Sequence, residues 1–234
     1  MLRRLVLPLT APIGSVKQIS SPRPDVVLTY DDGPQPGATE RVLSALAEFG
    51  CTATFFVLLG RARKHRSLLR EVADAGHEIA LHGVDHVRLT SLRASAVRRR
   101  TLDGKRELED LTGREVSWFR PPYGAQRPST YAAIRSTGLE SVVWNAAGFD
   151  WEDRPARDIA ARALGEVHSG SVLLMHDGFA GPGDGVDDGP EPTFDRGEVT
   201  RLLCEGLAER GLNGVSLKDS LREGTTVRRA WFRS

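Results

Sequence analysis

Short apolar segments rich in β-branched residues alternate with longer amphipathic segments along most of the chain. Residues 26–30 have the pattern of a buried strand, which ends at the turn signal Gly33-Pro34. Residues 38–49 then place apolar side chains on one helical face, and Gly50 ends this predicted helix. Further strands are predicted at 52–59, 77–81, 116–119, 139–144, 171–175 and 214–217, and helices at 65–75, 91–111, 128–137, 155–167 and 196–210. Seven strands alternating with helices predict a parallel α/β fold, either a barrel or a doubly wound sheet.

Length and composition indicate a single globular domain. The chain has 234 residues, which suits one α/β barrel, and no internal repeat or interdomain linker is visible. We predict a domain over 25–220, an extended N-terminal segment over 1–24 and a C-terminal tail over 221–234. With 32 Lys and Arg against 31 Asp and Glu, the net charge is +1, so the chain lacks the basic excess that is typical of proteins that bind nucleic acid. Only two cysteines are present, which excludes a disulfide scaffold and a Cys-rich zinc module.

The N-terminal residues only partly resemble an export signal. Arg3 and Arg4 precede a short apolar run, but Pro8 and Pro12 interrupt it before it reaches the length of a signal sequence. No window approaches the roughly 20 apolar residues that a membrane span needs. We therefore expect a cytoplasmic protein without a membrane span.

Unusual polar residues follow the predicted strands. In parallel α/β folds the functional groups collect at the carboxyl ends of the strands, which meet at one rim. The candidate residues at this rim are Asp31 and Asp32, His82 and His86, Arg120, Asp150, and His176. Polar residues placed by chance would not follow so many of the predicted strands at the same rim.

The two rim histidines predict a metal centre. His82 and His86 have the i, i+4 spacing that places two imidazoles on one side of a helical turn. With one carboxylate they would make a three-ligand site with room for water, which is typical of a catalytic Zn²⁺. Taken alone, such a histidine pair is more often found on the surface, and Asp-Asp before Gly-Pro is usually a turn signal. Their joint appearance at neighbouring strand ends favours the metal site.

Two adjacent carboxylates can divide the work of hydrolysis. One can bind the metal while the other serves as general base for a metal-bound water. His176 lies at the same rim and can supply the proton that a leaving group needs. Asp150 could orient this imidazole, and Arg120 could pair with the free carboxylate. For each of these three residues alone, a structural ion pair or cap explains the sequence equally well.

Five sequence strings carry a resemblance to a known family. They are Thr29-Tyr30-Asp31-Asp32-Gly33-Pro34, His82-x-x-x-His86, Arg120-Pro121-Pro122-Tyr123-Gly124, Asp150-Trp151 and Leu174-x-His176. In this order and spacing they resemble the five motifs of the polysaccharide deacetylases, carbohydrate esterase family 4, also called the NodB-homology domain. The resemblance spans roughly residues 25–218, which is nearly the whole chain.

The resemblance implies a deformed (β/α) barrel of about seven parallel strands in a single domain. It implies a metal-dependent hydrolase that removes an acetyl group from an N-acetylated amino sugar or a sugar-containing metabolite. Asp31 would be the base, and Asp32, His82 and His86 would hold one divalent ion, Zn²⁺ or a similar ion such as Co²⁺ or Ni²⁺. His176 would be the acid.

The remaining motif residues acquire supporting roles from the same resemblance. Arg120 and Asp150 would tune the base and the acid, respectively. The backbone N–H of Tyr123 would help to hold the tetrahedral oxyanion, and Trp151 and Leu174 would line the pocket for the acetyl methyl group.

Three positions depart from the usual family motifs. Gly83 stands where the family usually has Ser or Thr, Ala147 occupies the first acidic position of the D-x-x-D-W string, and Tyr30 replaces the common Phe. None of these changes removes a proposed ligand, acid or base. Whether the substrate is a polymer or a small N-acetyl sugar stays open.

Other functions remain as alternatives. The same site could act as an O-acetyl sugar esterase or as an allantoinase-like cyclic amidohydrolase, although retention of both Asp31 and Asp32 disfavours the latter. A non-catalytic carbohydrate-binding descendant is disfavoured by the intact acid, base and ligand set. A non-haem iron oxygenase is disfavoured by the βα alternation. Residues 178–195 contain five Gly, three Pro and five acidic residues, and form either a solvated loop or a lid.

Overall fold

The computed structural model describes residues 14–233, and the part of the expected N-terminal extended segment before residue 14 lies outside the described residues. At its centre is a curled sheet whose strands follow the order β6-β5-β4-β3-β2-β8-β7, with β9 paired to β2. All the pairings in this sheet are parallel. The strands are β2 (Asp25–Asp31), β3 (Thr54–Leu58), β4 (Glu78–Gly83), β5 (Trp118–Phe119), β6 (Glu140–Ser141), β7 (Ala146–Ala147), β8 (Val172–His176) and β9 (Asn213–Val215). The prediction of a deformed parallel α/β barrel in one domain is confirmed.

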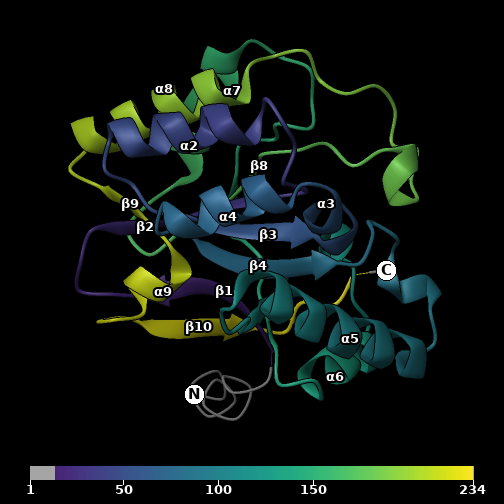
Figure 1. The fold of residues 1–234 in the computed structure, drawn as a ribbon. Coiled ribbons are helices and arrows are strands. Elements are labelled where there is room, and N and C mark those ends of the chain that lie inside the picture. The colour runs from purple at the N-terminus through teal and green to yellow at the C-terminus, as the bar shows by residue number, and fades with distance from the viewer. Residues whose placement is uncertain (1–13, 234) are drawn as a thin grey trace, which may run out of the picture.

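Helices cover the outside of this sheet (Figure 1). They are α2 (Thr39–Glu48), α3 (Leu59–Lys64), α4 (Arg66–Asp74), α5 (Ala94–Thr112), α6 (Pro128–Arg135), α7 (Ala156–Glu166), α8 (Arg196–Glu209) and the short α9 (Leu217–Ser220). Figure 1 shows α2, α7 and α8 together on one side of the molecule, with α5 and α6 on the other. All six predicted helices are present. Helices α3 and α9 were not predicted, because Leu59 and Leu217, which begin them, end the predicted strands 52–59 and 214–217.

The central strand β2 explains why its sequence is apolar without alternation. All seven of its residues are buried. Val26, Leu28 and Tyr30 pack into the layer between the sheet and its helices, whereas Val27 points into a smaller cluster inside the barrel with Phe56 and Val172. A parallel strand covered on both faces reads as one continuous hydrophobic run.

The strands that close the barrel are shorter than predicted. Only two residues each of the predicted strands 116–119 and 139–144 pair, as β5 and β6, and the two-residue β7 was not predicted. The alanines of β7 carry no β-branched signal in the sequence. The wall of the barrel between β6 and β7 is therefore built largely from loops.

A separate two-stranded antiparallel sheet joins the two ends of the described chain. It consists of β1 (Ser15–Ser20) and β10 (Thr225–Arg229). Strand β1 also forms isolated bridges to Val142 and Ser171, and its Val16 is buried inside the barrel. The end segments, which we predicted to flank the domain as an extended segment and a tail, thus pack onto the barrel.

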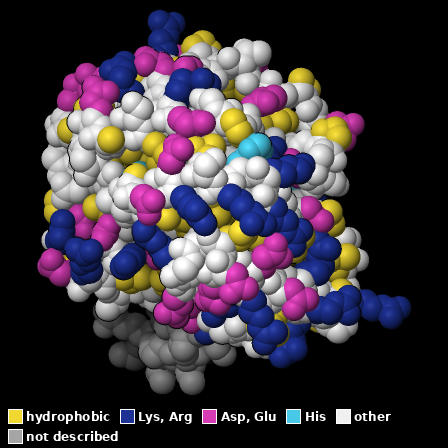
Figure 2. All heavy atoms as spheres, viewed as in Figure 1, with side chains coloured by type: hydrophobic (Ala, Val, Ile, Leu, Met, Phe, Trp, Pro, Cys, Tyr) yellow, Lys and Arg dark blue, Asp and Glu magenta, His cyan; other side chains and the backbone are white. Residues whose placement is uncertain are grey.

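Charged side chains of both signs are interspersed over the face of the molecule shown in Figure 2. This agrees with the near-zero net charge. None of the helices between residues 14 and 233 is both long enough and apolar enough to cross a membrane.

Trp231 tests whether the C-terminal segment belongs to the folded unit. Its indole N–H donates to the Gly124 carbonyl at 2.9 Å, and its ring lies 5.5 Å from that of Trp144. We expect Trp231→Ala to lower the free energy of unfolding by about 3 kcal/mol, because a side chain only 9% exposed is lost. Phe232→Ala, at a position 43% exposed, should change it by about 0.5 kcal/mol or less. Urea denaturation compares them, and equal values would contradict the packing role.

Candidate active site

The predicted rim residues converge at the carboxyl ends of the central strands. Asp31 at the end of β2 is the register partner of His176 at the end of β8. Around them opens a cavity of about 430 Å³. Of the ten predicted site residues, nine line it, namely Asp31, Asp32, His82, His86, Tyr123, Asp150, Trp151, Leu174 and His176. The tenth, Arg120, is buried beneath it and contacts Asp31.

Three side chains form a cluster able to bind a metal ion. Asp32, His82 and His86 are all buried, and one ligand atom from each lies within 4.8 Å of the others. Nε2 of each histidine is 3.5 Å from Oδ1 of Asp32. The cluster thus offers two nitrogens and one oxygen around a common point, a donor set that suits Zn²⁺ and related ions.

The backbone between the two histidines differs from the expected helical turn. His82 belongs to strand β4, and the chain then bends at Gly83, whose φ is +132°. A Cβ atom at position 83 would lie 2.8 Å from the Asp85 carbonyl oxygen. The imidazoles are therefore brought together by a strand end and a bend, and the positive φ of this bend suits glycine.

The hydrogen bonds around the cluster are those expected of a site that binds a cation. Oδ1 of Asp32 is buried and has no hydrogen-bond partner among the described residues. Such an orphan acceptor is costly unless something else satisfies it. Nδ1 of His82 lies 2.8 Å from the Arg120 carbonyl oxygen, which fixes its proton there and leaves Nε2 free. Burial lowers the pKa of His82 to about 3, which keeps the ring neutral, as a ligand must be.

Asp31 borders the metal-binding cluster, with Oδ2 3.7 Å from Nε2 of His82, and an arginine holds its other oxygen. Its Oδ1 accepts a 2.7 Å hydrogen bond from Nη1 of the fully buried Arg120, which also donates to Oγ1 of Thr29. Burial raises the pKa of Asp31 above the ordinary aspartate value, and the opposing charge of Arg120 only partly offsets this. This carboxylate is both accessible from the cavity and more basic than a surface aspartate.

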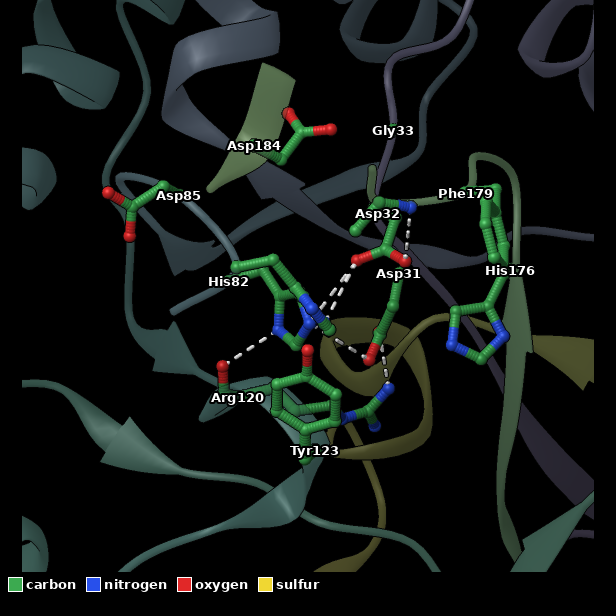
Figure 3. Close-up of polar contacts among 12 residues, drawn as sticks. Asp31, Asp32, Gly33, His82, Asp85, Arg120, Tyr123, His176, Phe179 and Asp184 are labelled. Atoms are coloured by element: carbon green, nitrogen blue, oxygen red, sulfur yellow. Dashed lines mark hydrogen bonds and ion pairs between the residues drawn. The ribbon is translucent and has the colours of Figure 1, made fainter. Parts of the chain in front are cut away.

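His176 lies on the side of the two aspartates opposite His82 (Figure 3) and is paired with Asp150. Its Nδ1 lies 2.7 Å from Oδ1 of Asp150, and its backbone N–H donates to Oδ2 of the same carboxylate at 2.7 Å. Burial alone would lower the pKa of His176, but the charge and hydrogen bond of Asp150 outweigh it and raise the pKa to about 9. The imidazole therefore carries a proton near neutral pH, with Nε2 as its free nitrogen.

Arg196 is a site residue that the sequence analysis missed. This side chain begins helix α8, is only 4% exposed, and donates to the His176 carbonyl at 3.2 Å. Its Nη1 also lies 3.5 Å from Oδ2 of Asp150. Asp150 is thus a buried carboxylate between two cations. No sequence feature distinguishes Arg196 from the many other arginines of the chain. It lies at the start of a predicted helix, where an arginine needs no special explanation.

Asp177 is a second missed residue, and it anchors the turn that carries both aspartates. Its carboxylate accepts from the Gly33 backbone N–H at 3.2 Å and from the Thr39 hydroxyl at 2.6 Å. Burial raises its pKa to about 6. Asp32 itself adopts the left-handed conformation, with φ of +74°, and its Oδ1 lies 3.5 Å from Nε2 of both His82 and His86. The sequence shows that Asp177 is adjacent to His176, but it does not show that Asp177 bonds to Gly33.

The predicted substrate-binding residues lie around the mouth of the cavity. Leu174 is buried in its wall, whereas Trp151 is 43% exposed and meets the His176 ring edge-on at 5.9 Å. Tyr123 has a left-handed backbone, with φ of +60°, and its ring lies 4.4 Å from that of His86. These side chains offer the apolar and aromatic surface on which a sugar and its acetyl group can rest.

Gly33 allows a test of the turn. A Cβ atom at this position would lie 1.9 Å from Oδ2 of Asp177. We expect Gly33→Ala to lower the free energy of unfolding by about 1–3 kcal/mol, because the buried carboxylate must shift. Gly165→Ala in α7, where nothing lies within 4 Å of the new methyl group, should be neutral or stabilising by up to about 1 kcal/mol. Chemical denaturation measures both, and equal effects would contradict this packing.

The pairing of His176 with Asp150 predicts a titration. Asp150→Asn should lower the pKa of His176 from about 9 to below its ordinary value, since burial then acts unopposed. Because the folded pKa is raised, the stabilisation from the pair is complete below about pH 6.5 and disappears as the pH rises through about 9. Imidazole NMR titration measures the pKa. Glu152→Gln, on the surface two residues away, should leave it near 9, and an unchanged value in Asp150→Asn would contradict the pairing.

The comparisons with known proteins agree with this geometry. The family model described as "Polysaccharide deacetylase" matches residues 18–142. A chitooligosaccharide deacetylase of Sinorhizobium fredii is 36% identical over 157 residues, covering 66% of this chain and 73% of the relative. A peptidoglycan-N-acetylglucosamine deacetylase of Bacillus cereus is 30% identical over 199 residues, covering 84% and 88%.

The fold is also shared with a solved structure that is described as inactive. It is a CE4 family pseudoenzyme from Bacillus anthracis, with a TM-score of 0.77 at 21% identity, covering 88% of this chain and 68% of that one. At this identity the likeness concerns the fold alone, so the case for activity depends on the side chains described above. By the family model and the two curated relatives, this chain belongs to the polysaccharide deacetylase family.

Proposed function

We propose that the protein is a metal-dependent deacetylase that hydrolyses the N-acetyl group of an amino sugar. One observation carries the proposal: Asp31 with Arg120 and His176 with Asp150 border the same cavity as the metal-binding cluster. A proton acceptor and a proton donor thus lie on either side of the place where an acetyl group would meet the cation. A mere binding protein would have no need for two buried ion pairs so arranged.

The metal would be held by Asp32, His82 and His86, whose donor set favours Zn²⁺. When bound, such an ion polarises the substrate carbonyl and lowers the pKa of a water. Asp31 is suited to be the base, because burial raises its pKa while Arg120 keeps it oriented toward the cavity. Its remaining oxygen, Oδ2, would take the proton of the attacking water.

The leaving group is an amine and needs a proton before the C–N bond breaks. His176 would supply it from Nε2, since Nδ1 is engaged by Asp150. Asp150 would stabilise the charged imidazolium. Burial alone would raise the pKa of Asp150, but the charge and hydrogen bond of His176, with a smaller contribution from Arg196, outweigh it and lower this pKa. Because Asp31 and His176 line the same cavity, one substrate position can contact both. The backbone N–H of Tyr123 would contribute a hydrogen bond to the tetrahedral oxyanion.

The substrate class follows from the relatives and from the cavity. The curated relatives are described as acting on chitooligosaccharide and on the N-acetylglucosamine of peptidoglycan. The cavity has room for an acetyl group and part of a sugar ring, with Trp151 exposed at its mouth. We therefore expect N-acetylglucosamine oligomers as the first substrates to test, with small N-acetyl sugars beside them.

Loss of the base gives the sharpest test of the mechanism. Asp31→Asn should lower kcat for acetate release from N-acetylglucosamine oligomers by about 10²- to 10⁴-fold, the usual contribution of a general base. Binding of Zn²⁺ should persist, since Asp32, His82 and His86 remain. The control is Asp110→Asn, which changes the same group on the exposed face of α5. Full activity of Asp31→Asn would refute its role as base.

Metal removal tests the other half of the proposal. Dialysis against a chelator should abolish acetate release, and addition of Zn²⁺, Co²⁺ or Ni²⁺ should restore it. Running O-acetyl sugars in parallel separates an amidase from an esterase that uses the same groups. Turnover that survives complete metal removal would contradict metal dependence, and cleavage of O-acetyl compounds alone would replace the deacetylase assignment with an esterase.

A further inference from the structure

The two histidines of the metal-binding cluster are supported unequally. His82 has a partner for its outer nitrogen, because Nδ1 lies 2.8 Å from the Arg120 carbonyl oxygen. Nδ1 of His86 is also buried, but it has no hydrogen-bond partner among the described residues. Histidines that bind metals almost always donate this second N–H to a carboxylate, carbonyl or water, which fixes the ring and strengthens the ligand. His86 therefore lacks an outer partner that its position calls for.

A carboxylate lies in the direction of this unpaired nitrogen. Oδ2 of Asp188 is 3.9 Å from Nδ1 of His86, just beyond hydrogen-bond distance. The same oxygen accepts a 2.5 Å hydrogen bond from the Tyr123 hydroxyl. Tyr123 in turn packs its ring against His86. Asp188 is thus fixed from one side by Tyr123, and a carboxylate oxygen can accept a second donor.

Asp188 belongs to the Gly- and acid-rich segment 178–195, and this segment already contacts two metal ligands. The Ala180 backbone N–H donates to Oδ2 of Asp32 at 3.3 Å, and the His86 backbone N–H donates to the Asp184 carbonyl at 2.9 Å. Arg61 of α3 fastens the segment by donating to the Phe179 carbonyl at 2.6 Å and to the Asp184 carboxylate at 2.7 Å. The base of the segment is therefore anchored on the site.

The part that carries Asp188 is less constrained. Its side chain is 43% exposed, and the neighbouring Gly185 and Gly189 both have positive φ values. A shift of about 1 Å in this exposed stretch would bring Oδ2 within hydrogen-bond distance of Nδ1. Such a shift costs little, because the loop tip has few buried contacts, and it would satisfy a buried N–H.

We infer that Asp188 is a positioning residue for the metal site: it accepts the Nδ1–H of His86 and so makes segment 178–195 part of the metal-binding structure. The inference rests on the metal site of the proposed function and gives this segment a defined task. The acidic side chain holds the His86 ring with Nε2 toward Asp32. It also ties metal binding to the closure of the segment over the cavity that Asp188 and Phe179 help to line.

Zinc affinity of the full-length protein is the primary test. Asp188→Ala should weaken Zn²⁺ binding about 10- to 100-fold in a competition assay with a chelating dye, which is the usual cost of losing an outer-sphere partner. The matched control is Asp187→Ala, which removes the same charge from the adjacent exposed position, where the side chain does not line the cavity. It should change the affinity by about twofold or less, since exposed charges are largely screened. Equal losses in the two variants would overturn the inference.

Imidazole NMR separates this role from a general loss of structure. In the zinc-loaded native protein we expect two downfield Nδ1–H signals, from His82 and His86. Asp188→Ala should remove or shift upfield one signal and leave the other, because the His82 bond to the Arg120 carbonyl is untouched. Two unchanged signals would refute the inference. Neither measurement needs turnover, so a native protein that binds Zn²⁺ but releases no acetate would refute the proposed function alone.

Discussion

The geometry of the site depends on the turn that carries the adjacent residues Asp31 and Asp32, whose carboxylates take different partners: only Asp31 pairs with Arg120, and only Asp32 contacts both histidines. Asp31 ends strand β2, and the left-handed conformation of Asp32 sends the next side chain toward the histidines. One carboxylate can then pair with Arg120 while the other faces His82 and His86.

The turn is held from the neighbouring strand. The Asp177 carboxylate accepts hydrogen bonds from the Gly33 N–H and the Thr39 hydroxyl. These bonds connect the ends of β2 and β8 to the start of α2. The same strand end carries His176, so the proposed proton donor and the residue that supports the turn are successive in the sequence. A buried carboxylate is costly unless its oxygens are satisfied, and here both are. Burial of this carboxylate costs desolvation free energy, and its two hydrogen bonds hold the turn that carries the proposed reacting groups in one place.

Much of the fold and the identity of the rim residues could be predicted from the sequence. The buried strands at 26–30 and 171–175 and the helices around them are long, apolar and bounded by clear turn signals. The polar residues after them had to meet, because parallel strand ends share one rim. The assignment of Asp31 and Asp32 to separate tasks came from the family resemblance, since adjacency alone cannot say which way each side chain points.

What escaped prediction depends on contacts between distant residues. Arg196 and Asp177 gain their importance from partners far away in the sequence, Asp150 and Gly33. The bend at Gly83 could not be distinguished from a helical turn, because i, i+4 spacing suits both. The pairing of β1 with β10 could not be predicted, because neither short end segment contains a sequence feature that identifies the other as its partner.

The very short strands β5, β6 and β7 have a consequence for how this site can change. Asp31, His82 and His176 stand on β2, β4 and β8, whose five to seven residues are almost entirely buried. Their partners Arg120 and Asp150 instead follow the two-residue strands β5 and β7. The opposite wall is made of loops joined by two-residue strands, and there Tyr123, Trp144 and Trp151 face the cavity. Exchange of an exposed loop residue such as Trp151 can therefore change the fit of the sugar while β2, β4 and β8 stay in place. The same loops carry Arg120 and Asp150, so the wall that faces the substrate also orients Asp31 and His176.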